Sequence, residues 1–304
     1  MPSKKKDSAA PQVETVEAAA VVAQPSAPRT RLAVRKTYKL YVGGAFPRSE
    51  SGRTYVVADS KGNFVANAAQ ASRKDARDAV LAARAAFGKW SGATAYNRGQ
   101  VVYRVAEMLE GRRDEFVSLE VPAAEVDAAI DRLVWYAGWT DKISQVIGGA
   151  NPVAGPYFNL SSPEPSGIVA IVAPSRPTLL GLVSVIAPVI ATGNTCVVIS
   201  DAPRVAITLA EVLATSDLPG GVVNILTGSA AEMGPWLAAH ADVNGVDLTG
   251  LADAELALSL EQAAAGTLKR VRRPAAALDW TADPGLPPMT AFLETKTVWH
   301  PKGI

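Results

Sequence analysis

Few side chains in this sequence could act as a nucleophile or a metal ligand. The chain contains one cysteine, Cys196, and two histidines, His240 and His300. A reactive thiol needs a cationic, partly exposed setting, whereas Cys196 lies in the apolar run 195–199, which is typical of a buried strand. One cysteine and two histidines exclude a zinc site of Cys and His ligands within one chain. No Gly-x-Ser-x-Gly nucleophile motif accompanies the histidines, so we predict no catalytic residue and no metal site.

Two glycine-containing turns have the composition of phosphate-binding turns. Gly228 and Gly234 keep a weak Gly-x5-Gly spacing, and Thr249-Gly250 follows an apolar strand. Gly250 would leave backbone N–H groups at a helix N-terminus, which can accept phosphate. The alternative for both motifs is a tight turn between a strand and a helix. The basic run 269–273 could bind phosphate or an acidic surface, or could be a solvated strand end.

The elements that would position these residues follow from the hydrophobic pattern. The segment 167–173 has no polar face, as expected of a strand in a parallel sheet covered on both sides. Strands are predicted at 167–173, 195–199, 222–226, 243–248 and 268–272, with helices at about 178–192, 204–215, 230–239 and 251–265. This alternation predicts an α/β fold with a Rossmann-like, doubly wound parallel sheet. Ligands of such sheets bind at the carboxyl ends of the strands.

Shorter patterns flank this sheet. A strand at 38–42 is expected to pair with 54–59 as a hairpin. Helices are then predicted from Ser72, whose Ser-Arg-Lys-Asp sequence resembles a capping box, from near Asn97, and from Pro122 through Ile143. The C-terminal segment has β-forming residues but no sequential strand partner. It must therefore pair with a distant segment or with another chain.

Composition excludes several classes of protein. The 304 residues carry a formal net charge of +1, which argues against a dedicated nucleic-acid-binding protein. The longest apolar run, Thr178 to Ala191, is too short to span a bilayer. A single cysteine fits a reducing compartment, so we expect a cytoplasmic protein without a membrane partner. Residues 1–36 read as a disordered tail; its basic Lys4-Lys5-Lys6 leaves open a transit-like or membrane-skimming role, but no apolar signal-peptide core follows.

Five stretches are distinctive when they are taken together. They are Tyr41–Phe46, Ala93–Arg104, Trp135–Trp139, Pro165–Thr195 and Leu218–Gly228. Their sequences and order resemble the aldehyde dehydrogenase superfamily. The resemblance implies a cofactor-type domain at 37–274 with N-terminal helices, a β oligomerisation arm at about 148–166 and a C-terminal oligomerisation strand at 289–304.

The sequence departs from this family where the family's chemistry resides. The resemblance implies a catalytic domain before the terminal strand, but only a connector at 275–288 is present. The Leu-Glu-Leu-Gly-Gly motif with its general base, and the cysteine nucleophile motif, are both absent. A thiolate is needed there to attack the aldehyde carbon. The chain is therefore identified as a truncated member of the superfamily that lacks the catalytic domain.

The cofactor positions differ as well. Ile199 stands where the family has a lysine that holds the adenosine ribose, and Leu251 replaces the serine of a Phe-Thr-Gly-Ser turn. NAD is expected to bind at most weakly, and Gly228, Thr249 and Gly250 are predicted to be remnants of the cofactor site.

These observations predict a catalytically silent homologue. It would act as a structural or regulatory subunit of an oligomer, with a full-length aldehyde dehydrogenase or with itself. The alternative is an NAD(P)-dependent oxidoreductase that acts on an aldehyde through a degenerate site, although the sequence offers no acid, base or hydride path for it. A degenerate product with no selected role is a third hypothesis, against which the consistent apolar patterning of the strands argues.

Overall fold

The computed structural model describes residues 32, 34–273 and 278–303. The chain divides into two units, Met1–Val34 and Arg35–Ile304, and the fold and the candidate site lie in the second unit. The predicted tail at 1–36 therefore lies almost entirely outside the described residues. Within the described part of the chain, no helix is long and apolar enough to cross a membrane.

A five-stranded parallel sheet forms the centre of the second unit. Its strands are β5 (Ile168–Val172), β6 (Thr195–Ser200), β7 (Val223–Thr227), β8 (Gly245–Asp247) and β9 (Arg270–Arg272), in the order β7-β6-β5-β8-β9. All neighbouring pairs are parallel, which confirms the predicted doubly wound α/β fold. β6 and β8 lie on opposite sides of β5, so the strand order reverses at β5. Ligands of such sheets usually bind at this point, beyond the carboxyl ends of the strands.

Helices pack on one face of this sheet in two layers. The inner layer consists of α6 (Thr178–Ala191) and α7 (Pro203–Ala214), and the outer layer includes α2 (Ala95–Glu110) and α4 (Ala123–Trp139). Every residue of α6 except Thr178 is buried. This helix is apolar all round because it lies between the sheet and the outer helices.

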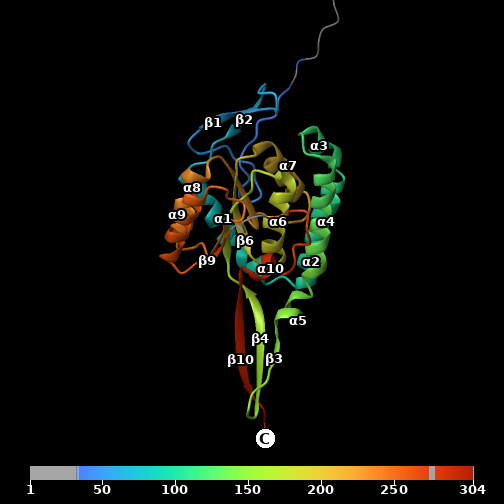
Figure 1. Cartoon of the computed structure of the whole chain (residues 1–304), viewed down its shortest axis with the longest axis vertical. Coiled ribbons are helices and arrows are strands. Elements are labelled where there is room, and N and C mark those ends of the chain that lie inside the picture. The colour runs from blue at the N-terminus through green and yellow to red at the C-terminus, as the bar shows by residue number, and fades with distance from the viewer. Residues whose placement is uncertain (1–31, 33, 274–277, 304) are drawn as a thin grey trace, which may run out of the picture. The chain divides into compact units, whose positions relative to one another are not determined.

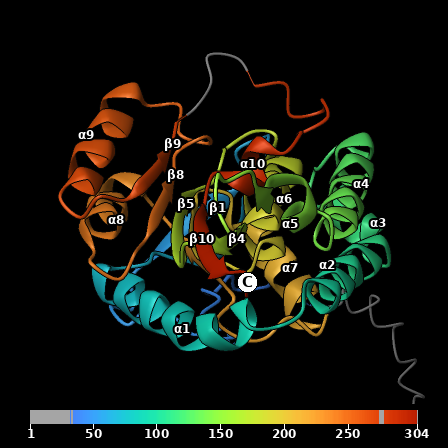
Figure 2. The ribbon, with the colours of Figure 1, turned by 90° about the horizontal axis from the view of Figure 1, so that it is seen from below.

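The opposite face carries α1 (Arg73–Ser91), α8 (Ala230–Ala239) and α9 (Ala254–Ala265), which bury a second apolar cluster. Figure 2 shows α8 and α9 on one side of the sheet and α6 and α4 on the other. The start of α1 is as predicted. Ser72 accepts a hydrogen bond from the Asp75 backbone N–H, and the Asp75 carboxylate accepts one from the Ser72 backbone N–H, so the capping box is complete.

The predicted N-terminal hairpin is wrong in its pairing. β1 (Thr54–Ala58) pairs with β2 (Phe64–Ala69), not with 38–42. Asp59 closes the intervening turn, because its carboxylate accepts the backbone N–H groups of Lys61 and Asn63 at 2.9 and 2.8 Å. The segment 38–42 instead forms isolated bridges, from Tyr38 to β2, from Tyr41 to β7 and from Val42 to Ala45.

The predicted helix from Pro122 to Ile143 is two helices. α4 ends at Trp139, and Ile143 begins the short α5 (Ile143–Ile147). The Thr140 hydroxyl donates to the Ala137 carbonyl at 2.8 Å, and such local side-chain bonds compete with continuation of a helix. The short α3 (Arg113–Ser118), which buries Phe116, lies between α2 and α4 in the sequence.

A three-stranded antiparallel sheet forms the arm (Figure 1). Its strands are β3 (Gly149–Asn151), β4 (Tyr157–Pro165) and β10 (Leu293–Pro301), in the order β10-β4-β3. The partner of the terminal strand is therefore β4 of the same chain, from Leu293 opposite Pro165 to Pro301 opposite Tyr157. Among the described residues no strand lies along the other edge of β10, so a row of backbone groups there is free to pair.

Phe292 fastens the terminal strand to the central sheet. The short α10 (Pro287–Thr290) precedes β10, and the side chain of Phe292 is only 1% exposed. A Cβ atom on Gly245 would come within 2.5 Å of the Phe292 ring, so the ring lies directly on the β8 backbone. Phe292 therefore cannot anchor a partner chain.

Candidate functional site at the carboxyl ends of the strands

A cavity of about 350 Å³ opens where β5, β6, β7 and β8 end. Two predicted site residues, Gly228 and Gly250, line it together with Ile199 and Leu251. The topology thus brings the turns after β7 and β8 to one place, as expected for a sheet of this kind. Thr249, the third predicted residue, is not part of the lining.

Each of the three predicted residues has a role in the local fold. Gly228 has φ +135°, a backbone conformation that favours glycine. A Cβ on Gly250 would lie 2.2 Å from the Pro174 nitrogen, so only glycine allows the turn after β8 to pack on the end of β5. Thr249 is buried, and both its backbone N–H, at 2.9 Å, and its hydroxyl donate to Asp247. The predicted alternative, a tight strand-to-helix turn, accounts for all three.

The electrostatics of the cavity are unfavourable for phosphate. Asp253 is the N-cap of α9 and accepts the Leu256 backbone N–H at 3.0 Å. Asp201 accepts the Ser175 hydroxyl at 2.6 Å. Among the described residues, no lysine, arginine or histidine lines the cavity. A bound phosphate would therefore face two carboxylates without a cation, and one of them already occupies the helix N-terminus that phosphate would use.

A smaller cavity of about 280 Å³ adjoins the first and shares Asp201, Gly228 and Ser229 with it. Tyr55 lines this second space, and its buried hydroxyl has no hydrogen-bond partner among the described residues. Burial, followed by the negative charge of Asp201, raises the pKa of Tyr55 to about 12. The phenol is therefore protonated at neutral pH and cannot act as a base.

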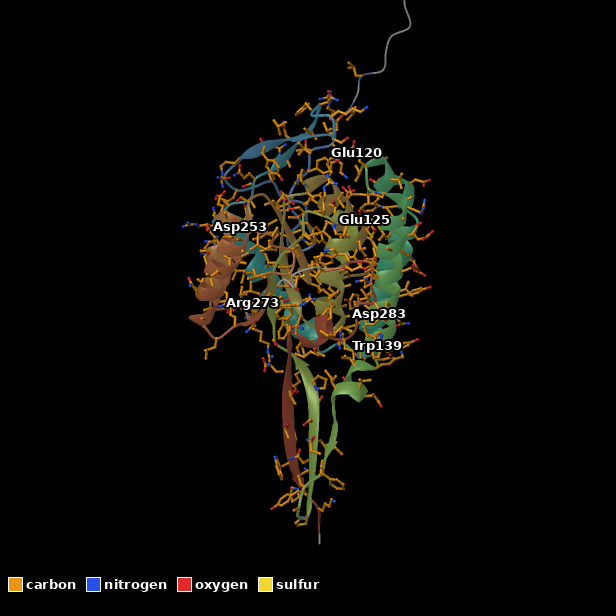
Figure 3. All side chains as sticks on the ribbon, viewed as in Figure 1. Glu120, Glu125, Trp139, Asp253, Arg273 and Asp283 are labelled. Atoms are coloured by element: carbon orange, nitrogen blue, oxygen red, sulfur yellow. The ribbon has the colours of Figure 1, made fainter. Side chains whose placement is uncertain are left out.

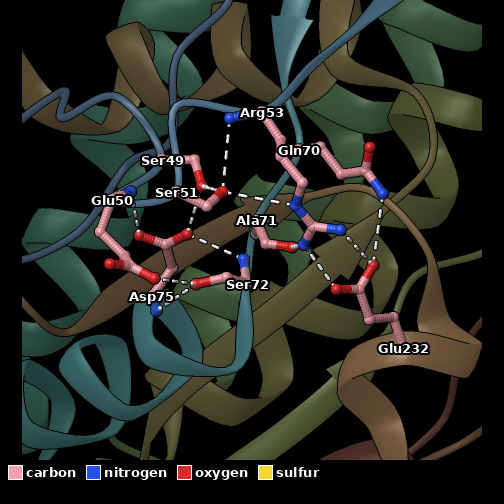
Figure 4. A network of polar contacts seen from close by, with 9 residues as sticks. All are labelled: Ser49, Glu50, Ser51, Arg53, Gln70, Ala71, Ser72, Asp75 and Glu232. Atoms are coloured by element: carbon pink, nitrogen blue, oxygen red, sulfur yellow. Dashed lines mark hydrogen bonds and ion pairs between the residues drawn. The ribbon is translucent and has the colours of Figure 1, made fainter.

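The carboxylates of Glu232 and Asp75 are held in a network of hydrogen bonds and an ion pair (Figure 4). Glu232, in the first turn of α8, accepts from Arg53 at 2.5 Å and from Gln70 at 3.2 Å. The hydrogen bond from Arg53 lowers the pKa of Glu232. Asp75 accepts the Ser49 hydroxyl at 2.7 Å and the Glu50 backbone N–H at 3.0 Å. These contacts tie the first hairpin to α1 and α8, so both carboxylates have a structural role.

The thiol and the imidazoles lie away from the cavity. Cys196 is completely buried inside β6, and burial raises the pKa of its thiol. His240 is the C-cap of α8, and its Nδ1 accepts the Asp242 backbone N–H at 3.1 Å. His300 lies in β10 on the arm. Within residues 35–273 and 278–303 no group of three His, Cys, Asp or Glu side chains could hold a metal ion.

The three arginines of the basic run pair with carboxylates, and Arg270 and Arg273 are exposed, as expected of a solvated strand end. Arg270 forms two hydrogen bonds of 2.6 Å with Glu294 at the base of the arm. Arg272 pairs with the buried Asp247 at 3.1 Å, and Arg273 pairs with Glu261 of α9. Figure 3 shows Arg273 and Asp253 on the α9 side of the unit. These guanidinium groups join β8, β9, α9 and β10.

Sequence reasoning missed the two aspartates of the cavity. Asp253 had a recognisable signal, because an aspartate immediately before an apolar helix is a preferred N-cap. Asp201 also had a signal, because it follows the predicted strand 195–199 at the end where ligands of such sheets bind.

We predict that NAD binds weakly, with a dissociation constant of about 0.03–1 mM. The absence of one charged and one neutral hydrogen-bond partner costs about 2–4 kcal/mol relative to a micromolar site. Asp253→Ser keeps an N-cap but removes a negative charge, so it should tighten binding about fivefold. Asp114→Ser, on an exposed turn of α3, is the matched control. Calorimetry that gave a value below about 10 μM for the natural chain would contradict the prediction.

The family model described as "Aldehyde dehydrogenase family" matches residues 46–273. The chain is 32% identical over 250 residues to the putative aldehyde dehydrogenase DhaS of Bacillus subtilis (strain 168), covering 77% of this chain and 50% of that protein. It is 34% identical over 240 residues to the cytosolic 10-formyltetrahydrofolate dehydrogenase of Mus musculus, covering 72% and 26%. The chain thus spans half the length of these relatives, or less.

Solved structures give the same result. The NAD+ complex of an aldehyde dehydrogenase from Bacillus cereus has a TM-score of 0.73 at 27% identity, covering 78% of this chain and 50% of that one. HpcC from Thermus thermophilus also has a TM-score of 0.73, at 30% identity, covering 78% and 48%.

Proposed function

This chain belongs to the aldehyde dehydrogenase family, and we propose that it is a catalytically silent member that acts as a structural or regulatory subunit beside a full-length aldehyde dehydrogenase. The proposal rests on a difference between the cavity at the strand ends and the arm of the same unit. The cavity at the strand ends has no thiol and no cation among the described residues, whereas the three-stranded arm has an open edge along β10.

The chemistry of aldehyde oxidation needs a thiolate within reach of the substrate carbon. The single thiol of this chain is inside β6 and protonated, because its pKa is raised by burial. β9 leads at Arg273 into a connector that reaches α10 at Pro287, so no domain that could supply a second nucleophile lies between them. A cytoplasmic location belongs to the same proposal and is supported by the single free cysteine.

The arm has the properties of an assembly surface. Phe158, Leu160 and Val298 are exposed on one face of its sheet, where Leu160 lies opposite Val298. Tyr157 and Trp299 are exposed on the other face and touch edge to face, with ring centroids 5.9 Å apart. Exposed apolar side chains beside an open strand edge are typical of a surface that another chain covers.

We predict that the chain forms a complex with a full-length aldehyde dehydrogenase of the same genome when the two are co-expressed. Trp299→Lys should abolish the complex, because Trp299 is 59% exposed on the arm and a lysine there adds a charge that an apolar interface would have to desolvate. Tyr96→Lys, which replaces an exposed aromatic residue of α2, should leave it intact. Size exclusion with light scattering measures both.

Deletion is a second test, and the structure decides where to cut. Removing 289–304 would take out Met289 and Phe292, which are core residues, and would damage the fold. Removing 296–304 keeps them together with the Arg270–Glu294 contact. If the chain stays monomeric on co-expression, or if the complex survives both Trp299→Lys and this deletion, the assembly proposal is wrong.

A further inference from the structure

Helix α4 carries a buried cation whose hydrogen-bond acceptors in the described part of the chain are all neutral. Arg132 is only 8% exposed. It donates to the Ser184 hydroxyl at 3.1 Å and to the carbonyls of Trp280 and Ala282, both at 2.8 Å. All of these acceptors are neutral, and Arg132 takes part in no ion pair among the described residues. A buried charge without a counter-ion is costly, which raises the question of what this guanidinium is for.

One turn further along α4, Tyr136 is 0% exposed and its hydroxyl has no hydrogen-bond partner among the described residues. Burial raises the pKa of Tyr136 to about 12, while the positive charges of Arg132 and Arg272, and the approach of the Arg132 guanidinium to the phenol oxygen, act in the opposite direction. The phenol therefore lies near both guanidinium groups. Since such buried polar atoms are almost always paired, its free O–H also requires an explanation.

The charges around this phenol do not balance. Arg272 pairs with Asp247 at 3.1 Å, so these two cancel and Arg132 remains as one excess positive charge. Glu125 lies two turns before Arg132 on α4, but its carboxylate accepts the backbone N–H groups of Leu179 and Leu180 at 2.7 and 3.3 Å. It thereby caps α6. Asp131, the neighbour of Arg132 in sequence, is exposed.

The outer side of the cluster is closed by the connector residues Leu278–Leu286, which we call the strap. Trp280 and Leu286 pack on the core that contains α4 and α6, whereas Thr281 and Ala282 are exposed. Asp283 of the strap lies on the α4 side of the unit, as does Glu125 (Figure 3). The two strap carbonyls on Arg132 are thus the layer between the guanidinium and the solvent.

We propose that Arg132 and Tyr136 form a binding site for a small carboxylate, which the strap closes in this structure. The planar guanidinium matches the two oxygens of a carboxylate. The N–H groups that would donate to those oxygens now donate to the strap carbonyls. The free O–H of Tyr136 supplies a further donor, and one negative charge balances the cluster. The ligand enters when the segment 280–282 lifts. This inference does not depend on a partner chain or on NAD.

The test uses the full chain with sodium benzoate as the probe and benzamide as its uncharged analogue. Calorimetry should give saturable binding of benzoate with a dissociation constant of about 1 mM or tighter, and none for benzamide. Hydrogen exchange at 278–288 should become faster with benzoate, because the strap is displaced. Absence of saturable benzoate binding, or equal binding of benzamide, would overturn the proposal.

Tyr136→Phe separates a binding role from a structural one. The hydroxyl makes no hydrogen bond among the described residues, so its removal should leave the unfolding midpoint unchanged yet weaken benzoate binding about tenfold, as for a lost bond to a charged group. Arg132→Lys keeps the charge but loses the planar fork and should weaken binding at least as much. Tyr103→Phe, on the exposed face of α2, is the matched control. If benzoate binds equally well to Tyr136→Phe and to the natural chain, the site is not the one proposed.

Discussion

Aldehydes supplied to the purified chain with NAD or NADP should not be oxidised at a measurable rate, and Cys196→Ala should leave that result unchanged. Cys196 is fully buried in β6, and the pKa of its thiol is raised by burial. A nucleophilic cysteine needs a thiolate that the substrate can reach. The described lining of the cavity at the strand ends offers neither a thiol nor a cation. We therefore expect no catalysed aldehyde oxidation at all, and not merely a reduced rate.

Cofactor reduction followed by absorbance, over a series of aliphatic and aromatic aldehydes, measures this directly. A full-length aldehyde dehydrogenase assayed in parallel shows that the substrates and cofactors are competent. A turnover near 1 s⁻¹, roughly the lower end of ordinary enzyme rates, that disappeared in Cys196→Ala would mean that the chain is an enzyme and that the thiol becomes exposed. The alternative interpretation as an oxidoreductase with a degenerate site would then be correct.

Phe292→Ala should destabilise the chain by about 3–5 kcal/mol, the range for truncating a buried phenylalanine. The ring is 1% exposed and lies against the β8 backbone at Gly245. The backbone of the same residue also accepts from Ser166 at 3.1 Å and from Asn194 at 3.0 Å. Loss of the ring removes the apolar contact that holds β10 to the central sheet, so the arm should loosen together with the loss of stability.

Urea unfolding of Phe292→Ala and of Trp299→Ala provides the comparison. Trp299 belongs to the same strand but is 59% exposed, and its replacement should change the free energy of unfolding by less than about 1 kcal/mol. Equal effects of the two substitutions would show that Phe292 does not fasten the arm.

The central sheet could be predicted because its strands are continuous apolar runs separated by helical periodicity. The start of α1 could be predicted because Ser72 and Asp75 act locally. The partner of β10 could not, because Thr297 lies opposite Ser161 across more than a hundred residues of sequence. β2 was missed for a different reason, since the turn at Asp59 sends the chain forward to a new strand instead of back to 38–42.

In the candidate site, too, local features could be predicted and contacts between distant segments could not. Gly228 and Gly250 were found because strand–turn–helix patterns are local, and the sheet order brought them together. The ion pair of Asp247 with Arg272 and the contacts of Arg132 with the strap depend on segments far apart in sequence. Arg132 in particular looks in the sequence like one more charged residue of an amphipathic helix. Only the packing of the connector shows that it is buried and has no acidic partner among the described residues.

Affinity purification of the tagged chain from its native host, at its native level of expression, tests the central claim most directly. The quantity to measure is the molar ratio of a full-length aldehyde dehydrogenase recovered with the chain, compared with the ratio for a tagged Trp299→Lys chain. We predict a fixed, near-integer ratio for the natural chain and loss of the dehydrogenase from the variant. Recovery of the chain alone, or recovery of the dehydrogenase in equal amounts with both, would contradict an assembly role for this protein.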